Sequence, residues 1–244
     1  MQLLSILFEV VGPVCLVAAV GYAWARSGTA FDVRFVSLLV THVGTPCLVI
    51  DSLTKSTLSL AAFGKIGLAT ILCHGSALLF GYLFVRALRD NVPAFVPALA
   101  FPNTGNMGLP LALFAFGQPG LALAVVVFTI GSVLHSTVGI WIVSGKPSPV
   151  ALFKAPLLYA TAIAIAIHEL AVPLPEFLLQ STRILGGMTI PLMLLSLGGS
   201  LSRMRIRNTA RVSTLAGLRV GIGLAAGVLV ALSFDLSPLE QIGR

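Results

Sequence analysis

The chain has 244 residues, of which 57% are hydrophobic and only 9% are charged, and its mean hydropathy is +1.02. A soluble domain carries about 25% charged residues, so this composition excludes a protein whose surface faces mostly water and predicts a polytopic membrane protein. The net charge of +7 forms no basic patch, because the basic residues are spread over short segments between apolar runs; we expect no nucleic-acid partner.

Eight apolar stretches have about the 20 residues that a helix needs to cross a bilayer core of about 30 Å. The first stretch carries Glu9 and has no basic region before it, which favours a membrane span over a removable signal peptide. All three cysteines lie within apolar stretches, and we interpret them as buried packing residues. The predicted spans are 3–25, 33–54, 63–88, 93–117, 120–144, 151–169, 175–201 and 208–233.

The distribution of lysine and arginine predicts the orientation of these spans. With the N-terminus outside, ten basic residues fall on the inner side and three on the outer side, which agrees with the excess of basic residues in cytoplasmic loops. We therefore expect a multi-pass protein of the plasma membrane, the inner membrane in a bacterium, with its N-terminus outside. The inner residues are Arg26, Arg34, Arg86, Arg89, Lys146, Lys154, Arg203, Arg205, Arg207 and Arg211.

Two prolines indicate an internal repeat. Pro46 interrupts the second span and Pro191 interrupts the seventh, 145 residues later, and the same offset maps 63–88 onto 208–233. Five spans per repeat is an odd number, so the second copy must be inverted in the membrane, as in many secondary transporters. The prediction is an all-α protein with a five-helix repeat at 1–144 and an incomplete inverted copy at 145–244.

The offset also predicts a second copy of the interrupted fourth span at 238–262, whereas the sequence ends at Arg244. Eight of ten expected spans are therefore present. Two interpretations stay open: a fragment of a ten-span protein, or a shortened relative.

The fourth span contains the most unusual segment of the chain, AFPNTGNMGLP at 100–110. Pro102 and Pro110 each remove a backbone donor and clash with the preceding turn, and the two glycines and two asparagines between them favour turns. An unsatisfied backbone group in lipid costs several kcal/mol, so such a break must be covered by protein or water. We predict two half-helices separated by a break at 101–108.

The two ends of this break suggest two kinds of ligand. The second half-helix, expected to begin near Asn106, offers free amides and the positive end of its dipole to a carboxylate. The carbonyl groups that end the first half, near Ala100 and Phe101, could hold a cation instead. The predicted substrate-binding residues are Pro102, Asn103, Thr104, Gly105, Asn106 and Pro110, with Thr45, Pro46 and Pro191 from the other proline breaks.

Ionisable groups within the spans are candidates for coupling to protons or ions: Asp51, His42 and His74. For Asp51, an ordinary interfacial carboxylate beside Lys55 is an equal alternative. His74 and Arg219 occupy equivalent repeat positions, which suggests a polar interior or anion path.

The segment FPNTGNMGLPLALFAFG resembles the fourth-helix signature of the auxin efflux carrier family, and TIPLMLLSLGGSL resembles the seventh helix of that family. The resemblance extends along the whole chain and implies a ten-helix bundle of inverted repeats, similar in fold to the bile-acid sodium symporters, that works by an elevator-like motion. It places Pro102 and Asn103 at a crossover that contacts substrate. The short connection between the fifth and sixth spans is similar to that of bacterial members, which are permeases for small organic acids such as malate or malonate. The missing second crossover departs from this pattern.

The resulting hypothesis is a secondary active transporter for small organic anions that uses alternating access around the broken fourth span. A sodium-coupled symporter of the bile-acid type and a truncated, non-transporting membrane protein stay open as alternatives. We expect contact with a lipid bilayer, no cofactor beyond a coupling H⁺ or Na⁺, no metal site, and a homodimer as one conceivable assembly. The sequence shows no catalytic-triad spacing, so we do not expect an enzyme.

Overall fold

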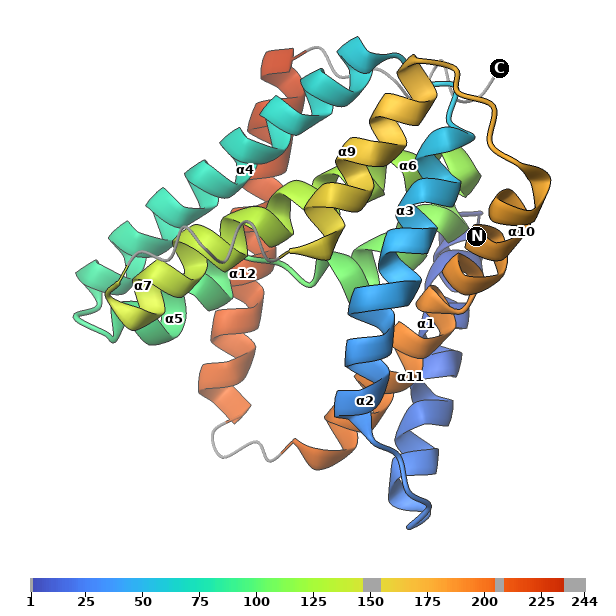
Figure 1. Ribbon diagram of the computed structural model, residues 1–244. Helices are drawn as coiled ribbons and strands as arrows, with labels where there is room; N and C mark the ends of the chain where they lie inside the picture. The colour runs from blue at the N-terminus through green and yellow to red at the C-terminus, as the bar shows by residue number, and fades with distance from the viewer. Residues whose placement is uncertain (1, 147–154, 205–208, 235–244) are drawn as a thin grey trace. The chain divides into compact units, whose positions relative to one another are not determined.

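The computed structural model describes residues 2–146, 155–204 and 209–234, and these ranges contain helices and no strand (Figure 1). Three short π-helical turns (η) interrupt the α-helices. The elements are α1 Gln2–Arg26, α2 Val33–Leu39, η1 Val40–Gly44, α3 Thr45–Thr54, α4 Leu60–Ala87, α5 Val92–Ala100, η2 Thr104–Gly108, α6 Leu109–Leu134, η3 His135–Gly139, α7 Ile140–Ser144, α9 Pro156–Glu169, α10 Glu176–Gly187, α11 Thr189–Arg203 and α12 Thr209–Phe234.

Helices cover every predicted span within the described residues. Six helical ranges are long and apolar enough to cross a membrane, and Pro156–Glu169 forms a shorter apolar helix. The predicted all-helical membrane fold is thus confirmed. Residues 151–154 of the sixth predicted span, and residues 235–244, where the offset places the second interrupted helix, lie outside the described residues.

Gly117 divides the longest helical range, Val92–Ser144, between the fourth and fifth predicted spans. Its backbone has φ 66° and ψ −155°, which is the only non-helical conformation found inside α6. Glycine adopts a positive φ without the steric penalty of a Cβ atom. The fourth span therefore ends at Gly117, where the sequence predicts its end.

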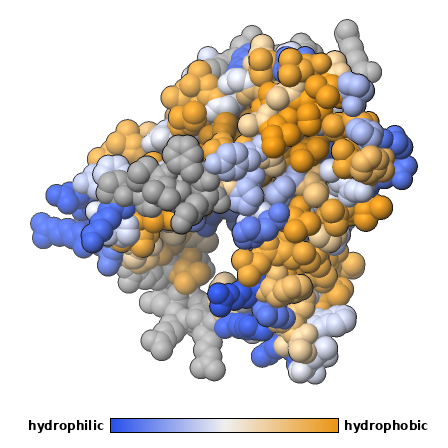
Figure 2. Space-filling model, in the orientation of Figure 1, coloured by the Kyte–Doolittle hydropathy of each residue, from blue (hydrophilic) through white to orange (hydrophobic). Residues whose placement is uncertain are grey.

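The helices direct many large apolar side chains outward. Leu16, Leu170 and Leu232 expose 68%, 74% and 78% of their surface. Figure 2 shows hydrophobic residues over much of the visible face of the helices. An apolar surface of this kind is unfavourable in contact with water, so these side chains fit a lipid environment. Cys15 is exposed as well, so its predicted burial is wrong, because it lies on an outward-facing side of α1.

The chain forms two compact units, each assembled from three segments. Unit 1 comprises Met1–Leu60, Asn103–Phe128 and Pro156–Arg205, and unit 2 comprises Ala61–Pro102, Thr129–Ala155 and Ile206–Arg244. Each unit therefore takes helices from both predicted repeats. The repeat boundary at 144/145 stays a prediction, because a spatial division of this kind does not test it.

Close backbone contacts hold unit 1 together. A Cβ atom on Gly21 would lie 2.2 Å from the carbonyl oxygen of Leu195, and one on Gly198 would lie 1.9 Å from that of Ala18, so glycine permits α1 and α11 to touch. Gly186 of α10 likewise lies against the backbone of Leu48 in α3. Small residues of this kind are typical of helix contacts in membranes.

In unit 2, the half-helix α5 packs against α7 and α12. Val85, Val96 and Leu99 form a buried cluster against which Leu215 and Leu218 of α12 pack. A second cluster, Ala77, Ala100 and Phe101, lies at the C-terminal end of α5. The end of the first half-helix is therefore fixed by apolar contacts within these two clusters.

Candidate functional site

The fourth span is interrupted, as predicted, but over fewer residues. α5 ends at Ala100, Phe101 has an extended backbone (φ −106°, ψ 98°), and the helical path resumes at Thr104. The predicted break at 101–108 is therefore too long, because residues 104–108 form the π-helical turn η2 that leads directly into α6. The interruption also coincides with the boundary between the units, which falls between Pro102 and Asn103.

Asn103 caps the second half-helix. Its side-chain oxygen accepts a hydrogen bond from the amide of Asn106 at 3.2 Å, and its carbonyl accepts from the amides of Met107 and Gly108 at 3.3 and 3.2 Å. The predicted start of the second half-helix near Asn106 is thus wrong, because the cap at Asn103 lets the helix begin two residues earlier, at Thr104. The amides of Thr104 and Gly105 precede the first intrahelical hydrogen bond and are, by position, the donors left for a ligand.

Gly105 lies where η2 meets the rest of unit 1. It is buried, and a Cβ atom there would lie 2.9 Å from the ring of Phe128 and 3.7 Å from the methyl group of Met193. Met193 belongs to α11, against which η2 packs. The start of the second half-helix is therefore held against the helix that carries Pro191.

The segments of spans two and seven that precede Pro46 and Pro191 meet in unit 1. A Cβ atom on Gly44 would lie 2.6 Å from the hydroxyl oxygen of Thr189, so the end of η1 touches the first turn of α11. Thr45, which is buried, follows Gly44 directly, and Pro46 comes next. The hydroxyl of Thr189 is buried and has no hydrogen-bond partner among the described residues.

Pro191 does not break its span, contrary to the prediction. The helix is interrupted at Met188, and Pro191 is exposed in the first turn of α11, where a missing amide costs little. In span two the π-helical turn η1 precedes Pro46, and the amide of Thr45 bonds to the carbonyl of Val40. The wider turn accommodates the proline without ending the helix.

Unit 2 contains the other end of the interruption. The carbonyl of Phe101 accepts a hydrogen bond from the Arg219 guanidinium at 2.7 Å. The Phe101 ring lies 5.2 Å from the His135 ring, edge to face, and 5.8 Å from the His74 ring. His74 is buried and its Nδ1 lies 2.9 Å from the carbonyl of Thr70. The sequence places His74 and Arg219 at equivalent positions, and the structure brings both to Phe101.

The candidate coupling groups lie apart. Asp51 forms an ion pair with Lys55, one helical turn later, and the His42 ring bonds within its own helix to the carbonyl of Leu38 at 3.0 Å. His42 and Asp51 belong to unit 1, and His74 belongs to unit 2. Among the described residues no group of three or more histidine, cysteine or acidic side chains is arranged for a metal ion.

The predicted substrate residues divide between the units. Pro102 belongs to unit 2, whereas Thr45, Pro46, Asn103–Asn106, Pro110 and Pro191 belong to unit 1. Within unit 1, Asn103 is exposed, Thr104 and Asn106 are half-buried, and Pro110 is fully buried. Unit 1 therefore offers an accessible asparagine beside a buried glycine and a half-buried threonine at one helix start.

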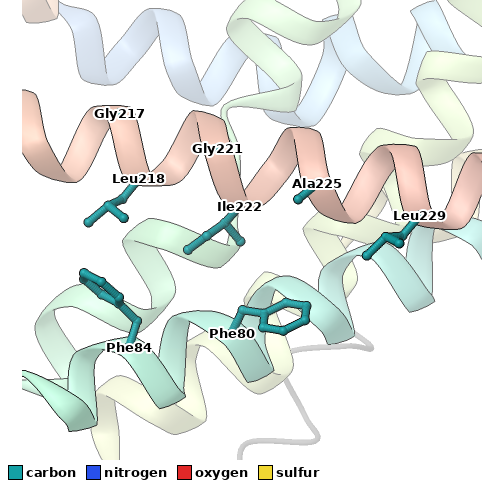
Figure 3. A pocket seen from close by; sticks show the side chains of 8 residues that line it. All are labelled: Phe80, Phe84, Gly217, Leu218, Gly221, Ile222, Ala225 and Leu229. Carbon is teal, nitrogen blue, oxygen red and sulfur yellow. The ribbon is translucent and has the colours of Figure 1, made fainter.

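An apolar pocket of about 490 Å³ lies between α4 and α12 in unit 2 (Figure 3). Phe80 and Phe84 extend from α4 toward a face of α12 that has glycine at Gly217 and Gly221. Its lining offers no charged or hydroxyl side chain to an anion. The remaining lining residues are Leu218, Ile222, Ala225 and Leu229.

Two residues of these sites are missing from the sequence-based prediction. Thr189 stands two residues before Pro191, and a threonine also stands next to Pro46, so hydroxyl groups beside both prolines were the available signal. The sequence singles out Arg219 only through its repeat partner His74. Its hydrogen bond to Phe101 spans 118 residues, which no local pattern reveals.

Comparison with known proteins adds evidence independent of this geometry. A family model described as membrane transport protein matches residues 6–152 and 144–243. An uncharacterized transporter of Methanocaldococcus jannaschii is 27% identical over 212 residues, covering 80% of this chain and 68% of the relative. A second uncharacterized transporter, from Methanothermobacter thermautotrophicus, is 26% identical over 219 residues, covering 83% and 71%. No solved structure matches the chain significantly.

Proposed function

Because the chain belongs to the membrane transport protein family, we propose that it is a secondary active carrier for small organic anions that works by alternating access around the interrupted fourth span. The resemblance of the fourth-span motif to the auxin efflux carriers agrees with this membership. Transport, and not catalysis, is the activity that such a membrane-embedded chain is expected to have.

The start of the second half-helix is the single observation that carries the proposal. Thr104 and Gly105 present amides without intrahelical acceptors, and the positive end of the helix dipole lies at the same place. A carboxylate is the ligand that such a helix start prefers. The exposed side-chain amide of Asn103 keeps one or more donors while its oxygen caps the helix, so it can orient an anion without bringing a full charge.

The surroundings within unit 1 suit a small anion. Gly105 is buried, and the place that its Cβ atom would take lies against the Phe128 ring and the Met193 methyl group, so the backbone of this helix start is held in place by packing. No acidic side chain occurs between Asn103 and Phe128, so this segment contains no charge that would repel a carboxylate. Affinity would therefore come from backbone amides and the helix dipole.

The direct test is Asn103→Ala in the full chain, reconstituted in proteoliposomes and assayed with a panel of labelled dicarboxylates and aromatic acids. We expect the wild type to transport one or more of these anions and the variant to lose this flux. Normal membrane insertion and unchanged flux in the variant would contradict the assignment of Asn103.

Asn91→Ala provides a matched control. Asn91 caps α5 in the same way, with its side-chain oxygen 3.1 Å from the amide of Ala94, but it lies at the far end of that half-helix. Both variants lose about 1 kcal/mol of capping energy. Only loss of the cap at the interruption, in Asn103→Ala, should change transport. An equal loss of flux in Asn91→Ala would indicate a general effect on folding.

We further propose a plasma-membrane location with the N-terminus outside, and a homodimer as the assembly to test. Labelling of a cysteine placed at either end of α1, with an impermeant reagent added to intact cells, distinguishes the two orientations. Proton or sodium coupling is decided by flux measured with each gradient imposed separately. The His42, Asp51 and His74 side chains are the groups to vary if a proton gradient drives uptake.

A further inference from the structure

The C-terminal end of α5 differs from an ordinary helix end. The helix has nine residues, Val92–Ala100, and Pro102 prevents its continuation. The last carbonyl groups of a helix lack intrahelical donors, and the negative end of the dipole lies there. In an apolar environment these carbonyls need a donor or a cation, and in discontinuous transporter helices Na⁺ often fills this role.

Here an arginine supplies both the donor and the charge. The Arg219 guanidinium, from the middle of α12, donates to the carbonyl oxygen of Phe101 at 2.7 Å. Hydrogen bonds from an ionised donor are shorter and stronger than neutral ones. Arg219 is half-buried, so water screens this contact less than it would on an exposed surface.

The groups around this contact disfavour a mobile cation. The ionisable side chains that lie against Phe101 come from three elements: His74 of α4, His135 of η3 and Arg219 of α12. All three are basic, and none can supply the carboxylate oxygen that a hard cation prefers. The Phe101 carbonyl, which the sequence offers to a cation, is already bonded to Arg219.

We propose that Arg219 is a positioning residue that caps the free carbonyl end of α5 with a resident cation and thereby fixes where the fourth span breaks. The guanidinium is covalently part of the chain, so it neutralises this end of the helix without an ion from solution. No sodium ion is required at this place. This last consequence rests on the proposed function, because it concerns the ion requirement of transport.

The test uses the full chain in lipid nanodiscs and measures the thermal unfolding midpoint. Arg219→Ala should lower the midpoint by about 5 °C, as expected for loss of a hydrogen bond to a charged group in a chain of this size. Guanidinium chloride, added far below denaturing concentrations, should restore most of this loss, because the free ion fits the space that the side chain leaves. Sodium and choline chloride should not restore it.

Matched variants separate capping from general structural damage. Arg86 is an exposed arginine in the last turn of α4 in the same unit, and Arg86→Ala should leave the midpoint unchanged with or without guanidinium. Arg219→Lys keeps the charge and should retain more stability than Arg219→Gln, which keeps only a neutral donor. The Lys and Gln pair decides the matter if the alanine variant does not fold.

Three results would overturn the proposal. The first is that guanidinium raises the unfolding midpoint of Arg219→Ala no more than that of Arg86→Ala. The others are equal stability of the Lys and Gln variants, or a higher wild-type midpoint in sodium than in choline. Flux in proteoliposomes is a separate measurement. Wild-type flux that is equal in sodium and choline supports the resident cation, and flux that requires sodium contradicts it. Absence of flux for every anion contradicts the proposed function, while the unfolding experiment still tests the cap.

Discussion

The two ends of the interrupted span are satisfied in opposite ways. At the C-terminal end of α5, the Phe101 carbonyl bonds to Arg219, a charged residue 118 positions away in the sequence. At the start of η2, the cap is Asn103 itself, which bonds to Asn106 only three residues later. One end is closed by a long-range charged contact, whereas the other is organised locally by a neutral side chain.

This difference separates the polar groups that we assign to structure from those that we propose for ligand binding. The charged contact places a guanidinium on the Phe101 carbonyl, and this positive charge disfavours a mobile cation at the same oxygen. The local cap uses only the amides from Asn106 onward and leaves those of Thr104 and Gly105. Under the proposed function, the neutral end is therefore the one that would receive the anion.

The largest effect is expected from Asn103→Asp, which tests whether the neutral end receives an anion. Aspartate caps helices as well as asparagine does and favours the positive end of the dipole, so stability should change little. A fixed carboxylate beside the ligand's carboxylate should lower flux by about 100-fold or more, since two like charges near 4 Å repel by about 4 kcal/mol at an effective dielectric constant of 20. Proteoliposome flux measures the expected loss of transport, and the unfolding midpoint checks that stability is unchanged.

Asn103→Ser serves as the control for that variant, because serine also caps helices but brings no charge. It should retain far more flux than Asn103→Asp. Equal flux in the aspartate variant and the wild type would show that no anion approaches this helix start.

A smaller effect is expected from Gly105→Ala, which tests the packing behind the same end. Its new Cβ atom would lie 2.9 Å from the Phe128 ring, so the ring or η2 must shift, at a cost of about 1 to 3 kcal/mol. In Gly108→Ala the nearest atom is Cβ of Thr104 at 3.5 Å, an ordinary contact, and alanine is favoured in a helix. The first variant should lower the unfolding midpoint and the second should leave it equal or raise it. The opposite order would mean that η2 is not held against Phe128.

The sequence predicts the helices well because hydropathy and span length are local properties. The predicted spans 33–54 and 208–233 agree with the structure to within one residue at each end. The interruption of the fourth span is also readable, since Pro102 cannot continue α5. Its extent is not, because the capping bond of Asn103 restores a helical path at Thr104, which proline and glycine content does not reveal.

Long-range contacts explain what the sequence could not predict at the candidate site. Pro191 looks like a break point, yet the helix is interrupted at Met188 and Pro191 tolerates its place in the first turn of α11. The equivalence of His74 and Arg219 suggested a shared environment without naming Phe101 as the residue that both approach. The close approach of Gly44 to Thr189 depends on packing between spans two and seven, to which no local motif corresponds.

The smallest effect is expected from Phe101→Leu, which tests whether the ring or the carbonyl holds the charged end. Phe101 is 9% exposed and packs near Ala77 and Ala100, so leucine should cost about 1 kcal/mol and leave the bond from Arg219 to the backbone intact. Flux should be unchanged, because the proposed substrate-binding groups lie at the other end of the interruption.

A double-mutant cycle with Arg219→Ala makes this prediction sharp. If Arg219 acts through the carbonyl, the free-energy losses of Phe101→Leu and Arg219→Ala should add to within about 0.5 kcal/mol in the double variant. The unfolding free energies of the wild type, the two single variants and the double variant show whether the losses add. A coupling energy well above this value would mean that Arg219 acts through the Phe101 ring and its contacts with His74 and His135. The guanidinium would then be a neighbour of the helix end and not its cap.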